Sequence, residues 1–435
     1  MRKHSIFKVA GGLLATALLL SGCSNETTEP GADDPSEATG TEPVTLIVAT
    51  FNEFGYDDLY AEYMAANPNV TIEQKKAATS QEARDNMNTR LAAGSGLSDI
   101  EAVEVDWLPD LMQSSDLFED LASDEVKDRW LEWKTEAATS TDGRLIGYGT
   151  DIGPEAVCYR ADLFEKAGLP SDREEVAKML GSTWDDYFNA GKEFVAKSDG
   201  VAWFDSATAI YNGRINQLEN AFSTSDTEEQ LIPLDENTDI KDIYESTLKA
   251  AVDDKLSAGV AQWSPDWTNG FQTDAFATML CPSWMLGVVE GNAAGVEGWD
   301  IANTFPGGGG NWGGSYLTVP SMGENTAEAT KLAAWLTAPE QQLKAFTAKG
   351  TFPSQVEALD SEELANSTSE FFNGAEVGKI MAERAAAVDV NPYKGPQYFA
   401  ASTVVQDAMN RVEVDKIDDM QTSWDKAVEE FASLQ

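Results

Sequence analysis

The most constraining feature of this sequence is a regular alternation of β-branched runs with helical segments. The order is a strand over 44–50 (VTLIVAT), a helix over 57–68, a strand over 69–77, a helix over 80–96 and a strand-helix pair over 99–112. Ser80 is the expected N-cap of the helix that follows it. Strands that alternate with helices predict an α/β layered domain with a largely parallel sheet.

The length of the chain predicts its number of lobes, and its net charge excludes some classes of partner. The chain has 435 residues, 42% of them hydrophobic, which is enough for more than one packed core, so we expect two lobes. Its formal net charge of −44 repels nucleic acid and anionic lipid head groups, and we expect no nucleic-acid partner. A neutral or cationic ligand fits this charge better than an anionic one.

Histidine and cysteine usage limits the chemistry. The single histidine is His4, inside the N-terminal leader. The rest of the chain therefore lacks a His-based nucleophilic triad and His-ligated zinc or iron, and we expect no metal and no cofactor. Cys158 and Cys281 are far apart and form no CxxC motif. The sequence favours two buried free thiols, with a disulfide in an oxidising compartment as the alternative.

The N-terminus carries an export signal. Basic residues precede a short apolar run over 9–20, which ends in the sequence Leu-Ser-Gly before Cys23. This arrangement resembles the bacterial lipobox, so we expect a signal peptide over 1–22 and lipidation at Cys23. Residues 23–43 are rich in Pro, Gly, Ser, Thr and acidic residues, a composition that predicts a disordered tether. The expected location is the outer face of the cell membrane, and a plain cleaved signal peptide is the alternative.

Four later motifs, in order, resemble one family. They are AVCYRADLFEKAGLP, TWDDYFNAGKEF, CPSWMLG and GGSYLTVPSMGENTAEATKLAAWLT, and they are similar to extracellular solute-binding proteins of carbohydrate ABC importers, the group that includes maltose-binding protein. The resemblance implies an α/β, two-lobe periplasmic-binding-protein-like fold, with hinge segments and an interlobe ligand cleft. The stretches TDIGPEA, LPSDREEV and CPSWMLG look closest to actinobacterial members that take up β-linked plant oligosaccharides, such as cello- or xylo-oligosaccharides.

The resemblance also implies boundaries and partners. Hinges are expected near 151–154, 315–317 and 351–353, giving an N-lobe of 44–152 plus 316–352 and a C-lobe of 153–315 plus 353–435. The implied function is capture of a di- or oligosaccharide by a monomer that delivers it to the ABC permease subunits in the membrane, without catalysis. A surface-anchored glycosidase, a binding protein for another small solute and a structural surface lipoprotein are the alternatives.

Aromatic residues beside amides and carboxylates mark the expected sugar site. Sugar faces lie flat on aromatic rings, and sugar hydroxyls bond to Asp, Glu, Asn and Gln. Asn52 and Glu53 follow the first strand, at the end where open α/β sheets bind ligands. Trp107 and Trp284 flank strands, where core packing explains them equally well, and Asp106 fits a helix cap equally well. The expected ligand-binding residues are Asn52, Glu53, Asp106, Trp107, Asp151, Asp205, Asn212, Trp263, Trp267, Trp284, Trp312 and Tyr393.

Overall fold

The computed structural model describes residues 42–224 and 230–434 of the chain. The expected signal peptide 1–22, the expected lipidation site Cys23 and residues 24–41 of the expected tether lie outside the described residues. Across the residues that are described, no helix combines the length and the apolar composition needed to cross a membrane.

The first sheet has five strands in the order β2-β1-β3-β9-β4. These strands are β1 (Val44–Phe51), β2 (Val70–Ala77), β3 (Ile100–Glu104), β4 (Gly147–Gly149) and β9 (Ser315–Thr318). β1 is parallel to both β2 and β3, whereas β9 is antiparallel to both β3 and β4. The prediction of a largely parallel sheet is therefore wrong. Strand β9 returns from a distant part of the chain and inserts in the opposite direction.

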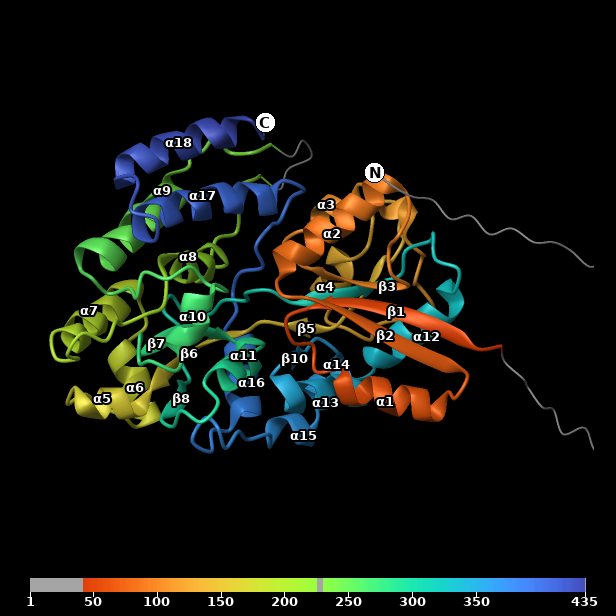
Figure 1. Cartoon of the computed structure of the whole chain (residues 1–435), viewed down its shortest axis with the longest axis horizontal. Helices are drawn as coiled ribbons and strands as arrows, with labels where there is room; N and C mark the ends of the chain where they lie inside the picture. The colour runs from red at the N-terminus through yellow and green to blue at the C-terminus, as the bar shows by residue number, and fades with distance from the viewer. Residues whose placement is uncertain (1–41, 225–229, 435) are drawn as a thin grey trace, which may run out of the picture. The chain divides into compact units, whose positions relative to one another are not determined.

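Helices cover both faces of this sheet (Figure 1). They are α1 (Asp57–Ala66), α2 (Ser80–Ala93), α3 (Leu108–Met112), η1 (Ser115–Leu117), α4 (Glu132–Ala137), α12 (Thr326–Leu336) and α13 (Pro339–Lys349). The N-cap of α2 is Thr79, whose Oγ1 accepts a hydrogen bond from Glu82 N at 3.2 Å. The prediction of Ser80 as the cap is wrong by one residue, and Ser80 is left to bond elsewhere.

The second sheet is antiparallel, in the order β7-β6-β8. Its strands are β6 (Glu155–Arg160), β7 (Thr278–Pro282) and β8 (Trp299–Ala302). Val157 and Tyr159 of β6 pack into one hydrophobic cluster, and Ala156 and Cys158 pack into another. Because neighbouring side chains on a strand point to opposite faces, β6 is buried on both sides.

The helices around the second sheet come from three separate stretches of chain. They are α5 (Ala161–Lys166), α6 (Arg173–Leu180), α7 (Trp184–Val195), α8 (Ala207–Ile215), α9 (Thr238–Leu248), the π-helical turn η2 (Lys249–Asp253), α10 (Pro265–Gly270), α11 (Met285–Asn292), α14 (Val356–Leu359), α15 (Glu362–Ala365), α16 (Val377–Ala386), α17 (Tyr398–Glu413) and α18 (Met420–Ala432). Figure 1 shows the C-terminal helices α17 and α18, in dark blue, beside α8 and α9 of the second sheet.

Cys158 and Cys281 form a disulfide between β6 and β7. The favoured expectation of two free thiols is wrong. The antiparallel register places Cys281 opposite Ala156 and Cys158 opposite Met279, so the two cysteines are diagonal neighbours with Cα atoms 5.5 Å apart. Their separation of 123 residues hides this proximity from the sequence.

The chain passes between the two sheets three times, over residues 150–154, 303–314 and 350–355. The first and third crossings pair as the short antiparallel strands β5 (Asp151–Ile152) and β10 (Phe352–Pro353). The buried amide of Gln342 ties them to α13. Its Nε2 donates to Gly149 O at 2.8 Å, and its Oε1 accepts from Ser354 N at 2.9 Å. The crossings lie at or beside the predicted hinges, whose motion stays a prediction.

Candidate functional site

A cavity of about 400 Å³ lies against the crossings, between loops of the two sheets. From the first sheet it is lined by the residues that follow β1 and β3 and by the start of α2. From the second it is lined by Asn212 of α8, by residues 262 and 263 before α10, by Trp284 before α11 and by one face of α17. A volume in this range is typical of small-molecule sites.

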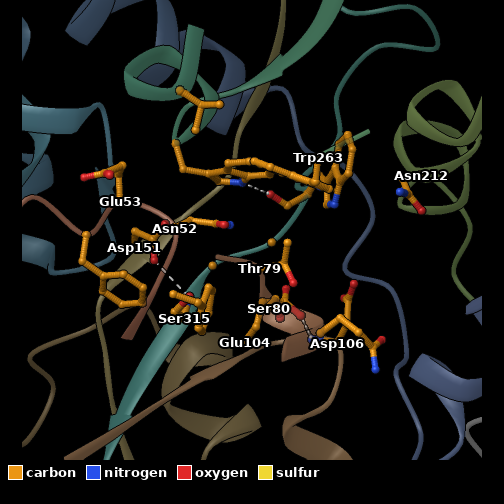
Figure 2. Close-up of a pocket in the computed structure, with 18 of the residues that line it drawn as sticks. Asn52, Glu53, Thr79, Ser80, Glu104, Asp106, Asp151, Asn212, Trp263 and Ser315 are labelled. Carbon is orange, nitrogen blue, oxygen red and sulfur yellow. Dashed lines mark hydrogen bonds between the residues drawn. The ribbon is translucent and has the colours of Figure 1, made fainter. Parts of the chain in front are cut away.

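Eight of the twelve predicted ligand-binding residues surround this one cavity. They are Asn52, Glu53, Asp106, Asp151, Asn212, Trp263, Trp284 and Trp312. Figure 2 shows how Glu53, Asn52 and Asp151 approach it from one side and Asn212 from the other, with Trp263 between them. The fold brings these residues together from segments that span much of the chain, and their contact with a ligand remains a prediction.

Three tryptophans form an aromatic wall, Trp263, Trp284 and Trp312. The rings of Trp263 and Trp284 are stacked, with centroids 6.1 Å apart and planes at 22°. Trp284 Nε1 donates to Trp312 O at 2.7 Å, and the two rings meet edge to face. Trp263 has a φ of 68°, a strained conformation for a bulky residue. The wall therefore presents partly exposed rings in a fixed arrangement.

The other four predicted residues do not line the cavity. Trp107 is 1% exposed because its indole packs in the hydrophobic core around the first sheet, where its Nε1 donates to Ser80 Oγ at 2.9 Å. Tyr393 is half-buried in the segment before α17, and its backbone N donates to Glu219 O at 2.8 Å. Neither residue is among the residues that line the cavity, and a ligand contact at either stays a prediction.

Asp205 and Trp267 support the wall from behind. Asp205 is fully buried, and its Oδ2 accepts from Trp267 Nε1 at 2.8 Å and from Gln262 Nε2 at 3.0 Å. The ring of Trp267 lies 5.1 Å from that of Trp263. Burial raises the pKa of Asp205, and these hydrogen bonds oppose the rise. The two residues therefore position Gln262 and Trp263, which do line the cavity.

Carboxylates at the rim of the cavity are paired with cations that lie outside its lining. Glu53 Oε1 accepts from Lys76 at 2.6 Å, and Lys349 lies 3.6 Å from Glu53 Oε2. Asp106, in the turn after β3, forms an ion pair with Lys394, which precedes α17. This pair joins the first sheet's side of the cavity to the second sheet's side.

A second group of charges is buried at the crossings. Asp151 Oδ1 accepts from Thr150 Oγ1 at 2.7 Å and from Ser315 N at 2.9 Å, so one of its oxygens ties the first crossing to the start of β9. Burial raises the pKa of both Asp151 and Glu104. Burial also lowers the pKa of Lys134 to about 7, and its Nζ lies 3.9 Å from the ring centroid of Tyr316.

The charges of the lining have one sign. Among the described residues, the cavity lining includes five carboxylates and no lysine or arginine. Acceptor atoms are also left open, because the buried Oδ1 atoms of Asn52 and Asn410 have no hydrogen-bond partner among residues 42–224 and 230–434. Buried polar atoms are nearly always paired, so these two mark places for a ligand's donors. The lining suits a neutral molecule rich in hydroxyl groups.

Sequence reasoning missed a face of α17 and the start of α2. The lining residues there are Thr79, Ser80, Gln81, Phe399, Thr403, Gln406, Asp407 and Asn410. The α17 positions recur at helical spacing, so a stripe was visible in the sequence. A polar stripe on a helix normally faces solvent, however, and nothing in the sequence distinguishes a solvent face from a cleft face.

Comparisons with known proteins identify the family and the fold of this chain. The family model described as bacterial extracellular solute-binding protein matches residues 58–372. An arabinooligosaccharide-binding protein of Bacillus subtilis (strain 168) is 25% identical over 436 residues, covering 94% of each chain. A crystal structure of an extracellular solute-binding protein family 1 member superposes with a TM-score of 0.77 at 49% identity, covering 90% of this chain and 99% of that one.

A more distant solved structure has the same fold. It is an ABC transporter associated binding protein from B. animalis subsp. lactis Bl-04 in complex with β-1,6-galactobiose. It superposes with a TM-score of 0.77 at 21% identity, covering 91% of this chain and 98% of that one.

Proposed function

Because the chain belongs to the family of bacterial extracellular solute-binding proteins, we propose that it captures a carbohydrate and delivers it to the permease of an ABC importer. The observation that carries the proposal is the cavity itself. It combines the aromatic wall and five carboxylates with amide oxygens that have no partner among the described residues, and none of its described lining residues is cationic. Aromatic faces suit the C–H faces of a sugar, and open acceptors suit its hydroxyls.

The ligand we propose is a di- or oligosaccharide. The Bacillus subtilis relative is an arabinooligosaccharide-binding protein, which makes arabino-oligosaccharides the first candidates. β-Linked plant oligosaccharides are the second candidates, on the resemblance seen in the sequence. Anionic sugars are disfavoured by the carboxylates of the lining.

Capture proceeds by closure of two lobes, 44–152 plus 316–352 and 153–315 plus 353–435, about the three crossings. The crossings are short segments beside the cavity, and small φ/ψ changes in such segments are enough for a hinge motion. The Asp106–Lys394 ion pair joins the two sides of the cavity, and we expect it to stabilise the closed arrangement. Closure predicts a smaller radius of gyration in small-angle scattering when the ligand saturates the protein.

We also propose that the protein is anchored outside the cell membrane through Cys23, with residues 24–43 as a tether. This proposal rests on the lipobox-like sequence before Cys23. Replacing Cys23 with serine is expected to move the protein from the membrane fraction to the medium, as measured by fractionation and immunoblotting. A variant that stays with the membrane would show that another element holds it there.

A thermal-shift panel of neutral mono- and oligosaccharides tests the proposed function. A sugar at about 1,000 times its Kd should add about 4 kcal/mol to the free energy of unfolding. Uronic-acid oligosaccharides serve as the charged controls and should shift the melting temperature less. Chromatography of the recovered sugar separates binding from hydrolysis. Hydrolysis products would favour the glycosidase alternative, and no shift with any sugar would contradict carbohydrate capture.

A further inference from the structure

Helix α17 presents two chemically different faces. Ala401, Val405 and Ala408 are fully buried in the hydrophobic cluster of the second sheet that also contains Val157 and Tyr159. Thr403, Gln406 and Asn410, spaced three and four residues apart, line the cavity instead. We call these three residues the polar stripe. Because they share one helix face, they form a continuous edge of the site.

The polar stripe offers hydrogen-bond acceptors. Thr403 Oγ1 donates to Phe399 O at 2.8 Å, which leaves its lone pairs free. Gln406 Nε2 donates to Ser402 Oγ at 3.0 Å, and no hydrogen bond within the described residues engages Gln406 Oε1. The Oδ1 of Asn410 is buried and has no hydrogen-bond partner in the part of the chain that the structure describes. Each residue of the stripe therefore retains an acceptor oxygen for a ligand.

The start of α2 lies across the cavity and offers donors. Ser80 Oγ already accepts from Trp107 Nε1, and Thr79 Oγ1 already accepts from Glu82 N. No hydrogen bond among the described residues uses the hydroxyl hydrogens of Ser80 and Thr79, so these hydrogens can be donated to a ligand. A sugar hydroxyl both donates and accepts, so a sugar ring between α2 and α17 can satisfy both sides.

The two helices approach one another at this end of the cavity. The guanidinium of Arg84, on α2, lies 4.8 Å from the ring centroid of Phe399, on α17. From Thr403 to Asn410 the polar stripe rises about 10 Å along the helix. This length exceeds that of one sugar ring, and the stripe is built on a different element from the aromatic wall.

We propose that the polar stripe and the start of α2 form a second sugar subsite, separate from the aromatic wall, so that this protein selects oligosaccharides over monosaccharides. This inference rests on the proposed function. The aromatic wall stacks one sugar unit, and the polar stripe holds the next unit through its hydroxyls.

A length series tests the proposal. Calorimetry compares the wild type with the double variant Gln406→Ala/Asn410→Ala, using arabinose and arabino-oligosaccharides of two, three and four units. If the panel identifies cello-oligosaccharides instead, glucose and that series replace them. The double variant should lose about 10- to 30-fold in affinity for ligands of two or more units, and less than 2-fold for the monosaccharide. Gln421→Ala/Glu429→Ala, on the exposed face of α18, is the matched control and should bind every length normally.

The outcomes separate this inference from the proposed function. If the wild type binds no sugar of either series or of the panel, the proposed function fails. If the wild type binds and the double variant loses affinity equally for all lengths, the stripe contacts the first unit and the second subsite is overturned. An unchanged affinity for every length in the double variant also overturns it. Circular dichroism of the variants confirms that α17 remains folded.

Discussion

Replacing Trp263 with alanine is expected to weaken carbohydrate binding by about 2–3 kcal/mol, which is a factor of about 30 to 150. Trp263 is a partly exposed ring of the aromatic wall, and it has an aromatic neighbour on each of two sides. Trp267 packs 5.1 Å behind it, and Trp284 stacks at 6.1 Å beside it. A ring held in this way gives contact area to a ligand at little entropic cost, because its position is already fixed.

Backbone strain at Trp263 supplies an internal check. Its φ of 68° is unfavourable for alanine but not for glycine. Trp263→Gly should therefore lose as much sugar affinity as Trp263→Ala, as measured by calorimetry. It should also unfold at a higher denaturant concentration than Trp263→Ala. Trp335→Ala is the matched control, because Trp335 is a partly buried indole that packs on Tyr63 away from the cavity. Normal binding by both Trp263 variants would contradict the placement of the ligand.

Removing the disulfide is expected to cost about 4–5 kcal/mol of unfolding free energy. Cys158 and Cys281 close a loop with a sequence separation of 123 residues, and long loops lose the most entropy when the unfolded chain is crosslinked. The double variant Cys158→Ala/Cys281→Ala should therefore unfold at lower denaturant concentration. The sugar affinity of its folded form should be unchanged, because neither cysteine lines the cavity.

Thiol reactivity and the denaturant midpoint of unfolding test the disulfide itself. In the wild type, both cysteines should react with a thiol reagent in denaturant only after reduction. The control Cys23→Ser should unfold like the wild type, because the disulfide joins Cys158 and Cys281 and leaves Cys23 out. Equal midpoints for the wild type and the double variant would contradict a stabilising disulfide.

The early part of the fold is predictable from the sequence because its signals are local. Residues 44–50 carry the β-branched pattern of a buried strand, and the structure has β1 at Val44–Phe51. The direction of β9 is not a local property. Its four residues form a short buried strand whose partners lie more than 150 positions away, so the sequence alone did not reveal a mixed sheet.

The candidate site was partly predictable for a similar reason. Trp263 and Trp312 have polar and glycine neighbours, which favours exposure, and both line the cavity. Trp267 has nearly the same neighbours, yet it is buried behind Trp263, because Ser264 caps α10 and turns its indole toward Asp205. Which tryptophan faces the cavity is therefore decided by one helical turn.

Hydrogen–deuterium exchange with and without a saturating oligosaccharide tests whether the cavity between the two sheets holds the ligand. We expect slower exchange on both sides of the cavity, in residues 79–81 and 104–106 and in residues 403–410, while α18 and α5 exchange as before. Protection confined to one side, or found only away from the cavity while calorimetry shows binding, would contradict it.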